Sequence, residues 1–260
     1  MIRALRTAST GMQAQQRQVE TIANNIANVN TTGFKKNRLS FRSLLYQNYR
    51  KPGANVTKDN LDPSGMQIGT GAQIASSVKN HQQGDIIPTG GDLDVAINGE
   101  GFFAVDSPSG ETYYTRDGAL HKDATGTIVT ADGFPISGGL KIPDGAQQIS
   151  IGIDGNISYK VNGTQATGGQ LTLHRFTNPA GLEAIGDNYY IETPSSGTAS
   201  QVTPGEAGGA LIKHKFLEQA NVAVVDELIE LIQAQRNYEL NSRTIKVGDE
   251  MMQQVNQMIR

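Results

Sequence analysis

The sequence contains no cysteine and no tryptophan, and only 37 % of its 260 residues are hydrophobic, below the ~45–50 % that is usual for globular chains. Without cysteine the chain forms neither a disulfide nor a thiolate metal site. No apolar run approaches the ~20 residues that span a membrane. The 30 glycines indicate instead a turn-rich protein with a limited core.

Sequence signals of catalysis and metal binding are also missing. The histidines at 81, 121, 174 and 214 stand at no metal-ligand spacing from one another, and we expect them on the surface or in strands. Asp92 and Asp94 share one face at the start of an expected strand, where a solvated edge is the simpler interpretation than an acid/base pair. No GxSxG and no phosphate-loop sequence occurs. We therefore expect no catalytic residue, no metal, no cofactor and no enzymatic activity.

The net charge of −3 conceals an uneven distribution. Residues 1–50 carry 8 basic side chains and a single acidic one, Glu20, whereas residues 51–212 carry 8 basic and 17 acidic side chains. A basic N-terminal region invites a nucleic-acid interpretation, but these charges form no binding motif, and we expect no nucleic-acid partner. The N-terminus also lacks the 7–15-residue apolar core of a secretory signal, so we expect no signal cleavage.

Apolar residues recur every seven positions at both ends of the chain, which is typical of helices that pack along a seam. The pattern predicts helices over residues 3–29 and 221–259, the second capped by Asn221. Polar residues beside the C-terminal column argue against a simple two-stranded coil and favour a helix packed among several neighbours. The expected assembly positions are Leu5, Met12, Val19, Ile22, Ile26, Val29, Val224, Leu228, Leu231, Tyr238, Ile245, Met252 and Ile259.

The middle of the chain has a different pattern, of short strands and turns. Ser40 is expected to cap a short helix through Leu44, Leu45 and Tyr46, and a Pro/Gly-rich loop follows it. Residues 194–210 are expected to be flexible. Asn162-Gly163 predicts a hairpin, because Asn-Gly pairs favour tight turns. The strand candidates are residues 72–79, 93–98, 101–105, 111–116, 126–130, 148–153, 156–161, 170–176 and 188–193.

The predicted fold class is α+β, with paired, coiled-coil-like N- and C-terminal helices and an inserted all-β domain of short antiparallel strands. We expect a discontinuous helical assembly core over residues 1–30 and 221–260, an extended bridging segment over 31–70, and a β-rich outer domain with a flexible return arm over 71–220. The positions expected to form the bridge are Leu44, Leu45, Tyr46, Pro52, Gly53, Pro63, Ser64 and Gly65.

Adjacent aromatic residues mark three of the expected strands, at 102–103, 113–114 and 189–190. Strand alternation sends one member of each pair inward, which suits a core plus an interface better than a sugar-binding platform. Two other classes of function are considered. The first is a glycan-binding β module on a helical stalk, which the aromatic pairs do not favour. The second is a wall-degrading enzyme, for which the sequence offers no candidate catalytic groups.

Several strings resemble the signatures of bacterial flagellar rod and hook proteins. They are NNIANVNTTGFK at 24–35, PSGMQIGTG at 63–71, DVAI at 94–97 with GEGFF at 99–103, YTRDG at 114–118 and RNYELN at 236–241. The resemblance spans almost the whole chain, and the combination is highly specific. The signature positions carried over are Asn24, Asn25, Ala27, Asn28, Gly33, Phe34, Arg236, Tyr238, Glu239 and Asn241.

Within this family, the length and the strings LLYQ and PSGMQIGTG most resemble the distal rod members. The resemblance implies a homo-oligomeric structural subunit of a hollow helical shaft that transmits torque and conducts exported subunits. It further implies proximal rod proteins, the hook protein, and peptidoglycan and outer-membrane ring proteins as partners. Export through the flagellar type III apparatus would deliver the uncleaved chain to the periplasmic basal body. The alternative is another rod or hook member, such as a proximal rod protein.

Overall fold

The protein divides into two compact units, seen in a computed structural model that describes all residues except 1, 51–54, 58–59, 62–63, 109, 162, 206–208 and 259–260. The helical unit comprises residues 1–26, 37–78 and 223–260, and the β unit comprises residues 27–36 and 79–222. Pro52, Gly53, Pro63 and Ile259, which the sequence analysis singles out, lie outside the described residues.

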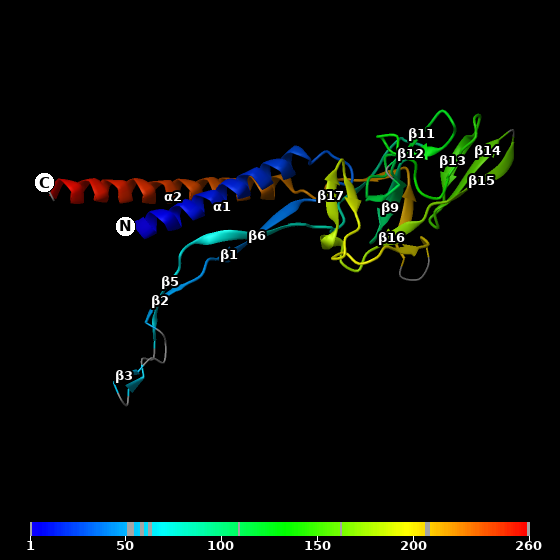
Figure 1. Ribbon diagram of the computed structural model, residues 1–260. Helices are drawn as coiled ribbons and strands as arrows, with labels where there is room; N and C mark the ends of the chain where they lie inside the picture. Colours follow the sequence, from blue (N-terminus) through cyan, green and yellow to red (C-terminus); the bar gives the residue numbers. More distant parts are fainter. Residues whose placement is uncertain are drawn as a thin grey trace. The chain divides into compact units, whose positions relative to one another are not determined.

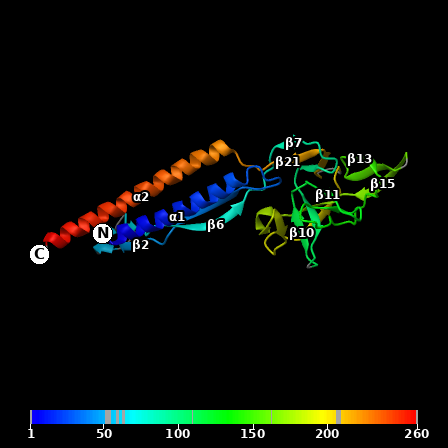
Figure 2. The same ribbon diagram turned by 90° about the horizontal axis from the view of Figure 1, so that it is seen from above.

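Two long antiparallel helices, α1 (Ile2–Ala27) and α2 (Val224–Met258), lie side by side in the helical unit (Figures 1 and 2). Leu5 near the start of α1 approaches Gly248 near the end of α2. Toward the other end of the pair, the amide of Gln18 donates to the carboxylate of Glu230 at 3.4 Å. The predicted pair of terminal helices is therefore confirmed.

A narrow β ribbon completes the helical unit. Its strands are β1 (Asn37–Ser43), β2 (Gln47–Arg50), β3 (Asn55–Thr57), β4 (Asn60–Leu61), β5 (Met66–Ile68) and β6 (Ala72–Lys79). β1 pairs with β6, β2 with β5, and β3 with β4. The ribbon runs past α1, where a side chain added at Gly71 would lie 2.2 Å from the Thr10 hydroxyl.

The helix expected after Ser40 is wrong, because residues 37–43 form strand β1. Strand β6 supplies β1 with backbone partners that a local capping signal cannot reveal, and such tertiary pairing overrides local propensity. Beyond β1, the Leu44 amide donates to the Gly71 carbonyl at 2.8 Å, which continues the contact between the two sides of the ribbon.

The β unit consists of short strands whose pairings are antiparallel. Its largest sheet has the order β17-β18-β10-β9-β16-β19, and a second sheet has the order β13-β14-β15. Two-stranded pairs are β20-β8, β21-β7 and β11-β12. The elements are β7 (Ile86–Pro88), β8 (Val95–Asn98), β9 (Phe102–Asp106), β10 (Thr112–Thr115), β11 (His121–Lys122), β12 (Ile128–Val129), β13 (Gln147–Ile151), β14 (Asn156–Val161), β15 (Thr164–Gln170), β16 (Leu173–Arg175), a 3₁₀ turn (Pro179–Gly181), β17 (Glu183–Gly186), β18 (Tyr189–Ile191), β19 (Ser200–Val202), β20 (Leu211–His214) and β21 (Phe216–Glu218).

Every predicted strand region contains a strand, and the predicted hairpin is confirmed. Strands β14 and β15 pair antiparallel from Val161↔Thr164 to Asn156↔Gln170, and Gly163 has the positive φ of +81° that such a turn demands. The flexible arm predicted at 194–210 is wrong for residues 200–202, because they form β19 and pair with β16. Ser196, earlier in this stretch, is fully buried.

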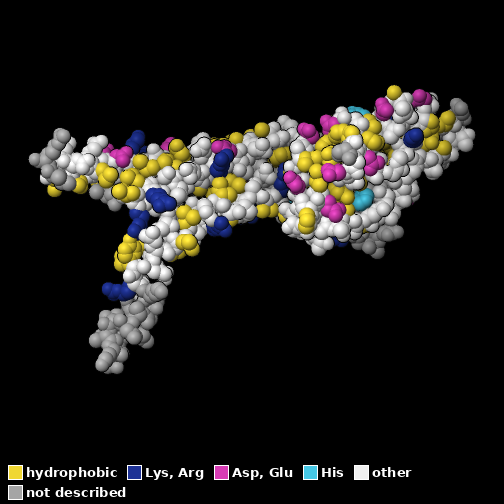
Figure 3. Space-filling view, viewed as in Figure 1, with side chains coloured by type: hydrophobic (Ala, Val, Ile, Leu, Met, Phe, Trp, Pro, Cys, Tyr) yellow, Lys and Arg dark blue, Asp and Glu magenta, His cyan; other side chains and the backbone are white. Residues whose placement is uncertain are grey.

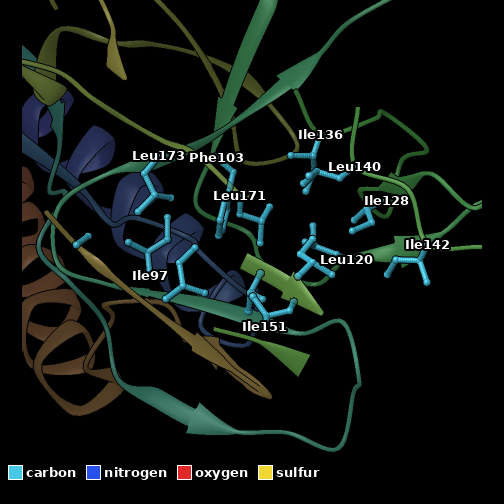
Figure 4. Packing of buried hydrophobic residues seen from close by; sticks show 14 of the residues in the cluster. Ile97, Phe103, Leu120, Ile128, Ile136, Leu140, Ile142, Ile151, Leu171 and Leu173 are labelled. Carbon is cyan, nitrogen blue, oxygen red and sulfur yellow. The ribbon is translucent and has the colours of Figure 1, made fainter. Parts of the chain in front are cut away.

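Two hydrophobic cores cover opposite faces of the six-stranded sheet. Phe103 belongs to the larger core, which Figure 4 shows with Ile97, Leu171 and Leu173. Its neighbour Phe102 points to the other face and packs in a smaller aromatic core. Both members of the pairs 102–103 and 189–190 are therefore buried. The expectation that one member of each pair faces an interface is wrong for these two pairs.

Neither of the described helices combines the length and the apolar character needed to cross a membrane. Among the described residues, no cluster of three or more histidine or carboxylate side chains could hold a metal ion.

Candidate assembly surfaces

The seam between the two helices is built from small and polar residues of α2. Its buried residues are Glu227, Ala234 and Gly248, which stand in one seven-residue column together with Asn241. A side chain at Gly248 would lie 2.6 Å from a methyl group of Leu5, and one at Gly11 would lie 3.0 Å from the Asn241 amide. Because glycine has no side chain, the helices approach closely at these two positions. Leu5 packs against Gly248, and Asn241 packs against Gly11.

The positions predicted for assembly divide between this seam and the surface. On α1, Ile22 is buried and Leu5, Met12, Val19 and Ile26 are half-buried, whereas Val29 packs against Phe34 in the β unit. On α2, Leu231 and Ile245 are half-buried, and Val224, Leu228, Tyr238 and Met252 are exposed. The predicted α2 column therefore flanks the seam, and the buried column lies three residues further along the helix.

Exposed apolar side chains form two stripes on α2. Figure 3 shows apolar side chains at the surface of the paired helices. The first stripe is Val225, Leu228, Ile229 and Ile232, which have the i, i+3, i+4, i+7 spacing of one helix face and are between 46 % and 69 % exposed. The second stripe is Leu240, Val247, Met251, Val255 and Met258. Of these residues only Leu228 is among the positions predicted from the sequence, although the helical spacing of the first stripe is visible there.

A buried polar contact joins α1, α2 and the start of β1. The Asn25 amide donates to the Asn37 carbonyl at 3.0 Å and to the Glu227 carboxylate at 3.1 Å. Its oxygen accepts from the Asn37 backbone N–H at 2.9 Å. Asn25 and Glu227 are both buried. Polar contacts buried in a helix seam specify register, because a shift would leave them unpaired.

A buried ion cluster ties distant segments of the β unit together. The Lys35 ammonium lies 2.5 Å from one Glu218 oxygen, and an Arg116 guanidinium nitrogen lies 3.0 Å from the other. The side chains of Lys35 and Glu218 are 0 % exposed and that of Arg116 is 3 % exposed. Lys35 also donates to the Gln82 carbonyl at 2.7 Å. Burial lowers the pKa of Lys35, while the Glu218 carboxylate opposes that shift.

Lys35 and Arg116 stand inside signature strings of the sequence, but neither they nor Glu218 are predicted to form a site. No local signal pairs them, because Glu218 lies 183 residues from Lys35 and 102 from Arg116. In the sequence, Lys35 directly follows the apolar Phe34. This pattern is too common to predict a buried ion pair.

Gly33 is placed where no other residue fits. Its φ is +67°, and an added side chain would lie 2.8 Å from the backbone of Arg116 and Asp117. Its N–H donates to the Glu218 carbonyl at 2.9 Å. The neighbouring Phe34 is buried against Ala220 and Val222. The signature residues Gly33 and Phe34 therefore hold the segment after α1 against the β unit.

Asn221 does not cap α2, which corrects the predicted role. Helix α2 begins at Val224. The Asn221 oxygen accepts from the Lys36 N–H at 2.9 Å, and its amide donates to the Asn80 carbonyl at 2.8 Å and the Gln82 carbonyl at 3.0 Å. The Asn221 side chain therefore forms its hydrogen bonds within the β unit and not with the first turn of α2.

The remaining signature positions have different surroundings. Thr31 donates to the Asn28 side chain at 3.2 Å in the turn that follows α1. Asn24, Ala27, Arg236 and Glu239 are exposed. Tyr238 is also exposed, whereas Asn241 faces Gly11 in the seam. Contacts among the described residues of one chain do not explain the exposed Arg236, Tyr238 and Glu239.

The described bridging residues present apolar side chains to solvent. Leu45 is 89 % exposed, Tyr46 is also exposed, and Leu44 is half-buried. The Thr70 hydroxyl donates to the Leu45 carbonyl at 2.8 Å. Ser64 and Gly65 lie directly before β5.

The acidic pair lies at the surface directly before β8, as the solvated-edge interpretation expects, whereas His81 lies among other side chains. Asp92 pairs with Lys215 at 2.8 Å, and Asp94 accepts from the Thr89 hydroxyl at 2.5 Å. His81 lies among aromatic rings, with its ring centre 5.6 Å from that of Phe102. Burial, together with the positive charges of Lys35, Arg116 and Lys79, lowers the pKa of His81 from 6.5 to about 4. His81 is half-buried and lies outside the strands, so it differs from the expected exposed or strand position.

Three family models match the chain in its two helical ends and its β unit. They are described as "Flagella basal body rod protein" at residues 5–35, "Flagellar hook protein FlgE/F/G D1 domain" at 96–159 and "Flagellar basal body rod FlgEFG protein C-terminal" at 213–258.

Full-length relatives carry related names. The flagellar basal-body rod protein FlgG of Buchnera aphidicola subsp. Acyrthosiphon pisum is 44 % identical over 99 % of this chain and 100 % of its own. The Bacillus subtilis protein of that name is 40 % identical over 98 % of both chains, whereas the flagellar hook-basal body complex protein FlhP of the same organism is 29 % identical over 98 % of this chain and 99 % of its own.

Proposed function

The chain belongs to the flagellar basal-body rod family of FlgG, and we propose that it polymerises as a structural subunit of the distal rod into a hollow helical drive shaft. The family places it in the flagellar basal body as a component of the rod. The higher identity to the B. subtilis FlgG than to the FlhP of the same organism supports the distal rod over other rod members.

The exposed stripes on α2 are the observation that carries this proposal. Val225, Ile229 and Ile232 leave large apolar surfaces in water, although the helix pairs with α1 along a different face. Contiguous exposed apolar surface on a protein marks a site of association. We assign both stripes to contacts with the helices of neighbouring copies. A contact between two different surfaces, repeated without closing, generates a helical filament.

The predicted domains and signature residues are assigned roles in the same rod. Residues 1–30 and 221–260 form the assembly core around the channel, and the exposed signature residues Arg236 and Glu239 contact adjacent subunits. Residues 71–220 are the β-rich outer domain of this scheme. Segment 31–70 bridges neighbouring subunits and stiffens the tube, for which the exposed Leu45 and Tyr46 supply apolar contacts. A shaft of this kind transmits torque from the motor to the hook and conducts exported subunits, and needs no enzymatic activity.

The proposed partners follow from this position in the flagellum. They are further copies of the chain, proximal rod proteins, the hook protein, and the peptidoglycan and outer-membrane ring proteins. The chain reaches the periplasm through the flagellar type III export apparatus, without cleavage of a signal. The aromatic pairs that a glycan-binding module would display are buried at 102–103 and 189–190, so no observation favours that alternative.

Charge substitution in the first stripe tests assembly. Ile229→Glu and Ile232→Glu place carboxylates on the exposed face and should abolish tube formation by concentrated protein in electron micrographs. The monomer should retain its stability within ~0.5 kcal/mol, because exposed sites contribute little to folding. Gln233→Glu, at an exposed position of the same helix, is the matched control and should form tubes. Normal tubes from both stripe variants would contradict the proposal.

The bridging role has its own test. Rods formed by a chain that lacks residues 52–62 should appear curved and flexible in electron micrographs. Straight, rigid rods would count against the bridging role of segment 31–70.

A further inference from the structure

The β unit contains a cleft of about 300 Å³ that is lined by more cations than carboxylates. Its lining includes Lys79, His81, Phe102, Arg116, Arg175 and Phe176. Glu100, which also lines it, pairs with Arg175 at 2.6 Å on the exposed rim. Arg175 is therefore paired with a carboxylate of the same chain at the mouth of the cleft.

The floor of the cleft carries unbalanced positive charge. Arg116 lines the cleft and shares the single Glu218 carboxylate with Lys35, so two buried cations face one anion. A buried charge without a counter-charge is costly, because the surrounding protein solvates it poorly. An anion in the cleft would offset that cost.

Lys79 adds a third cation on the wall. Its ammonium lies 5.3 Å from the ring centre of Phe34 and 5.7 Å from that of Tyr190. Within the described part of the chain it makes no ion pair, and burial lowers its pKa. The aromatic faces stabilise the cation but leave its N–H donors available to an acceptor.

Polar atoms beside the cleft also have no partner. The Nδ1 atom of His81 and the hydroxyl of Tyr190 are buried without a hydrogen bond among the described residues. The two rings lie 5.4 Å apart. Buried polar groups are nearly always hydrogen-bonded, so these two atoms next to the cleft lack the partner that such groups normally have.

We propose that this cleft is a carboxylate-binding site, with Lys79 as the principal ligand-binding residue and Arg116 and Arg175 as the flanking cations. Two sources offer this chemistry: a small free carboxylate, or an acidic side chain of a second copy. Residues 51–212 carry 17 acidic against 8 basic side chains, so a neighbouring copy offers many carboxylates. Only this second source rests on the proposed assembly.

The first experiment titrates the dilute full-length protein with sodium acetate and, separately, with sodium chloride at equal ionic strength. Backbone NMR signals of Gln82, Gly101 and Phe102 should shift saturably with acetate and much less with chloride. Lys79→Gln should weaken acetate binding about tenfold or more, the size expected for a lost hydrogen bond to a charged group. Lys160→Gln, an exposed lysine on β14, is the control and should bind as the unmodified protein does.

Equal shifts in acetate and chloride, or unchanged acetate affinity in a folded Lys79→Gln protein, would overturn the proposal.

The second experiment identifies the source. If a second copy supplies the carboxylate, acetate should raise the concentration needed for tube formation relative to chloride, and Lys79→Gln should raise it in either salt. If this concentration is unchanged while acetate still binds the dilute protein, the site takes a free carboxylate. Failure of the proposed assembly is distinguished from failure of the site, because the dilute titration involves no tubes.

Discussion

Lys35 and Glu218 lie 183 residues apart in the sequence and form an ion pair in which neither side chain has any exposed surface. Arg116 shares the same carboxylate, and the backbone N–H of Gly84 donates to it at 2.9 Å. One carboxylate therefore joins the segment after α1, the end of β10 and strand β21.

Glu218→Gln should destabilise the β unit by about 3–5 kcal/mol, because it leaves two buried cations without a counter-charge. Urea unfolding, followed by a probe in the β unit, measures the change in the free energy of unfolding. Glu183→Gln, an exposed carboxylate on β17, is the control and should change it by less than ~0.5 kcal/mol. A loss below ~1 kcal/mol in Glu218→Gln would mean that the cluster contributes little to stability.

Gly33→Ala should lower stability by about 3 kcal/mol or more. Two costs add: the left-handed conformation costs about 1–2 kcal/mol for a residue with a side chain, and the new methyl group meets the backbone of Arg116 and Asp117, which cannot give way as a side chain can. Gly133→Ala isolates the first cost, since Gly133 has φ +84° and no atom within 4 Å of the added group. Similar losses in the two variants would show that the close approach is unimportant.

Acid should destabilise the β unit through His81. The pKa is 6.5 in the unfolded chain and about 4 in the folded one, so the unfolded state takes up the proton first as the pH falls. The contribution of neutral His81 to the free energy of unfolding is therefore present above pH 6.5 and declines between pH 6.5 and 4. The total loss from this group is up to about 3 kcal/mol.

Chemical unfolding at a series of pH values between 7 and 4 measures that decline. His81→Phe should reduce it, whereas the exposed control His121→Gln should follow the unmodified protein. The interpretation is wrong if His81→Phe retains the full pH dependence.

Asn25→Ala should loosen the helical unit by about 1–3 kcal/mol, because the Asn37 backbone and the Glu227 carboxylate each lose a buried hydrogen bond. Hydrogen exchange of α1 amides reports this local stability. The exposed residue Gln13 provides the control Gln13→Ala, which removes a side chain of similar polarity from the same helix. Equal exchange rates in the two variants would contradict the proposed role of Asn25 in setting the register.

The helices and many of the strands could be predicted from the sequence, because periodicity is a local property. The seven-residue repeat located α1 and α2, and Asn162-Gly163 located the β14–β15 hairpin. Strand β1 was missed because its partner β6 lies 29 residues or more away and contributes no local signal.

The buried seam column was missed for another reason. Prediction from hydrophobicity follows large apolar side chains, whereas α1 approaches α2 at Ala234 and Gly248, where side chains are small. The large apolar residues of α2, which such a prediction places in the seam, are instead exposed or half-buried beside it. The ion cluster is beyond local patterns altogether, since Glu218 meets its partners only after the β unit folds.

The tie between Lys35 and Glu218 also has a consequence for the pairing of the two helices. In an unfolded chain, α1 and α2 are separated by a loop of about 200 residues. Once the β unit has folded, the contacts of Gly33 and Lys35 with Glu218 hold the inner ends of the two helices together, and the loop shortens to about a dozen residues. Loop-closure entropy then opposes helix pairing by roughly 2 kcal/mol less. A folded β unit therefore lowers the entropic cost of pairing the chain's two terminal helices.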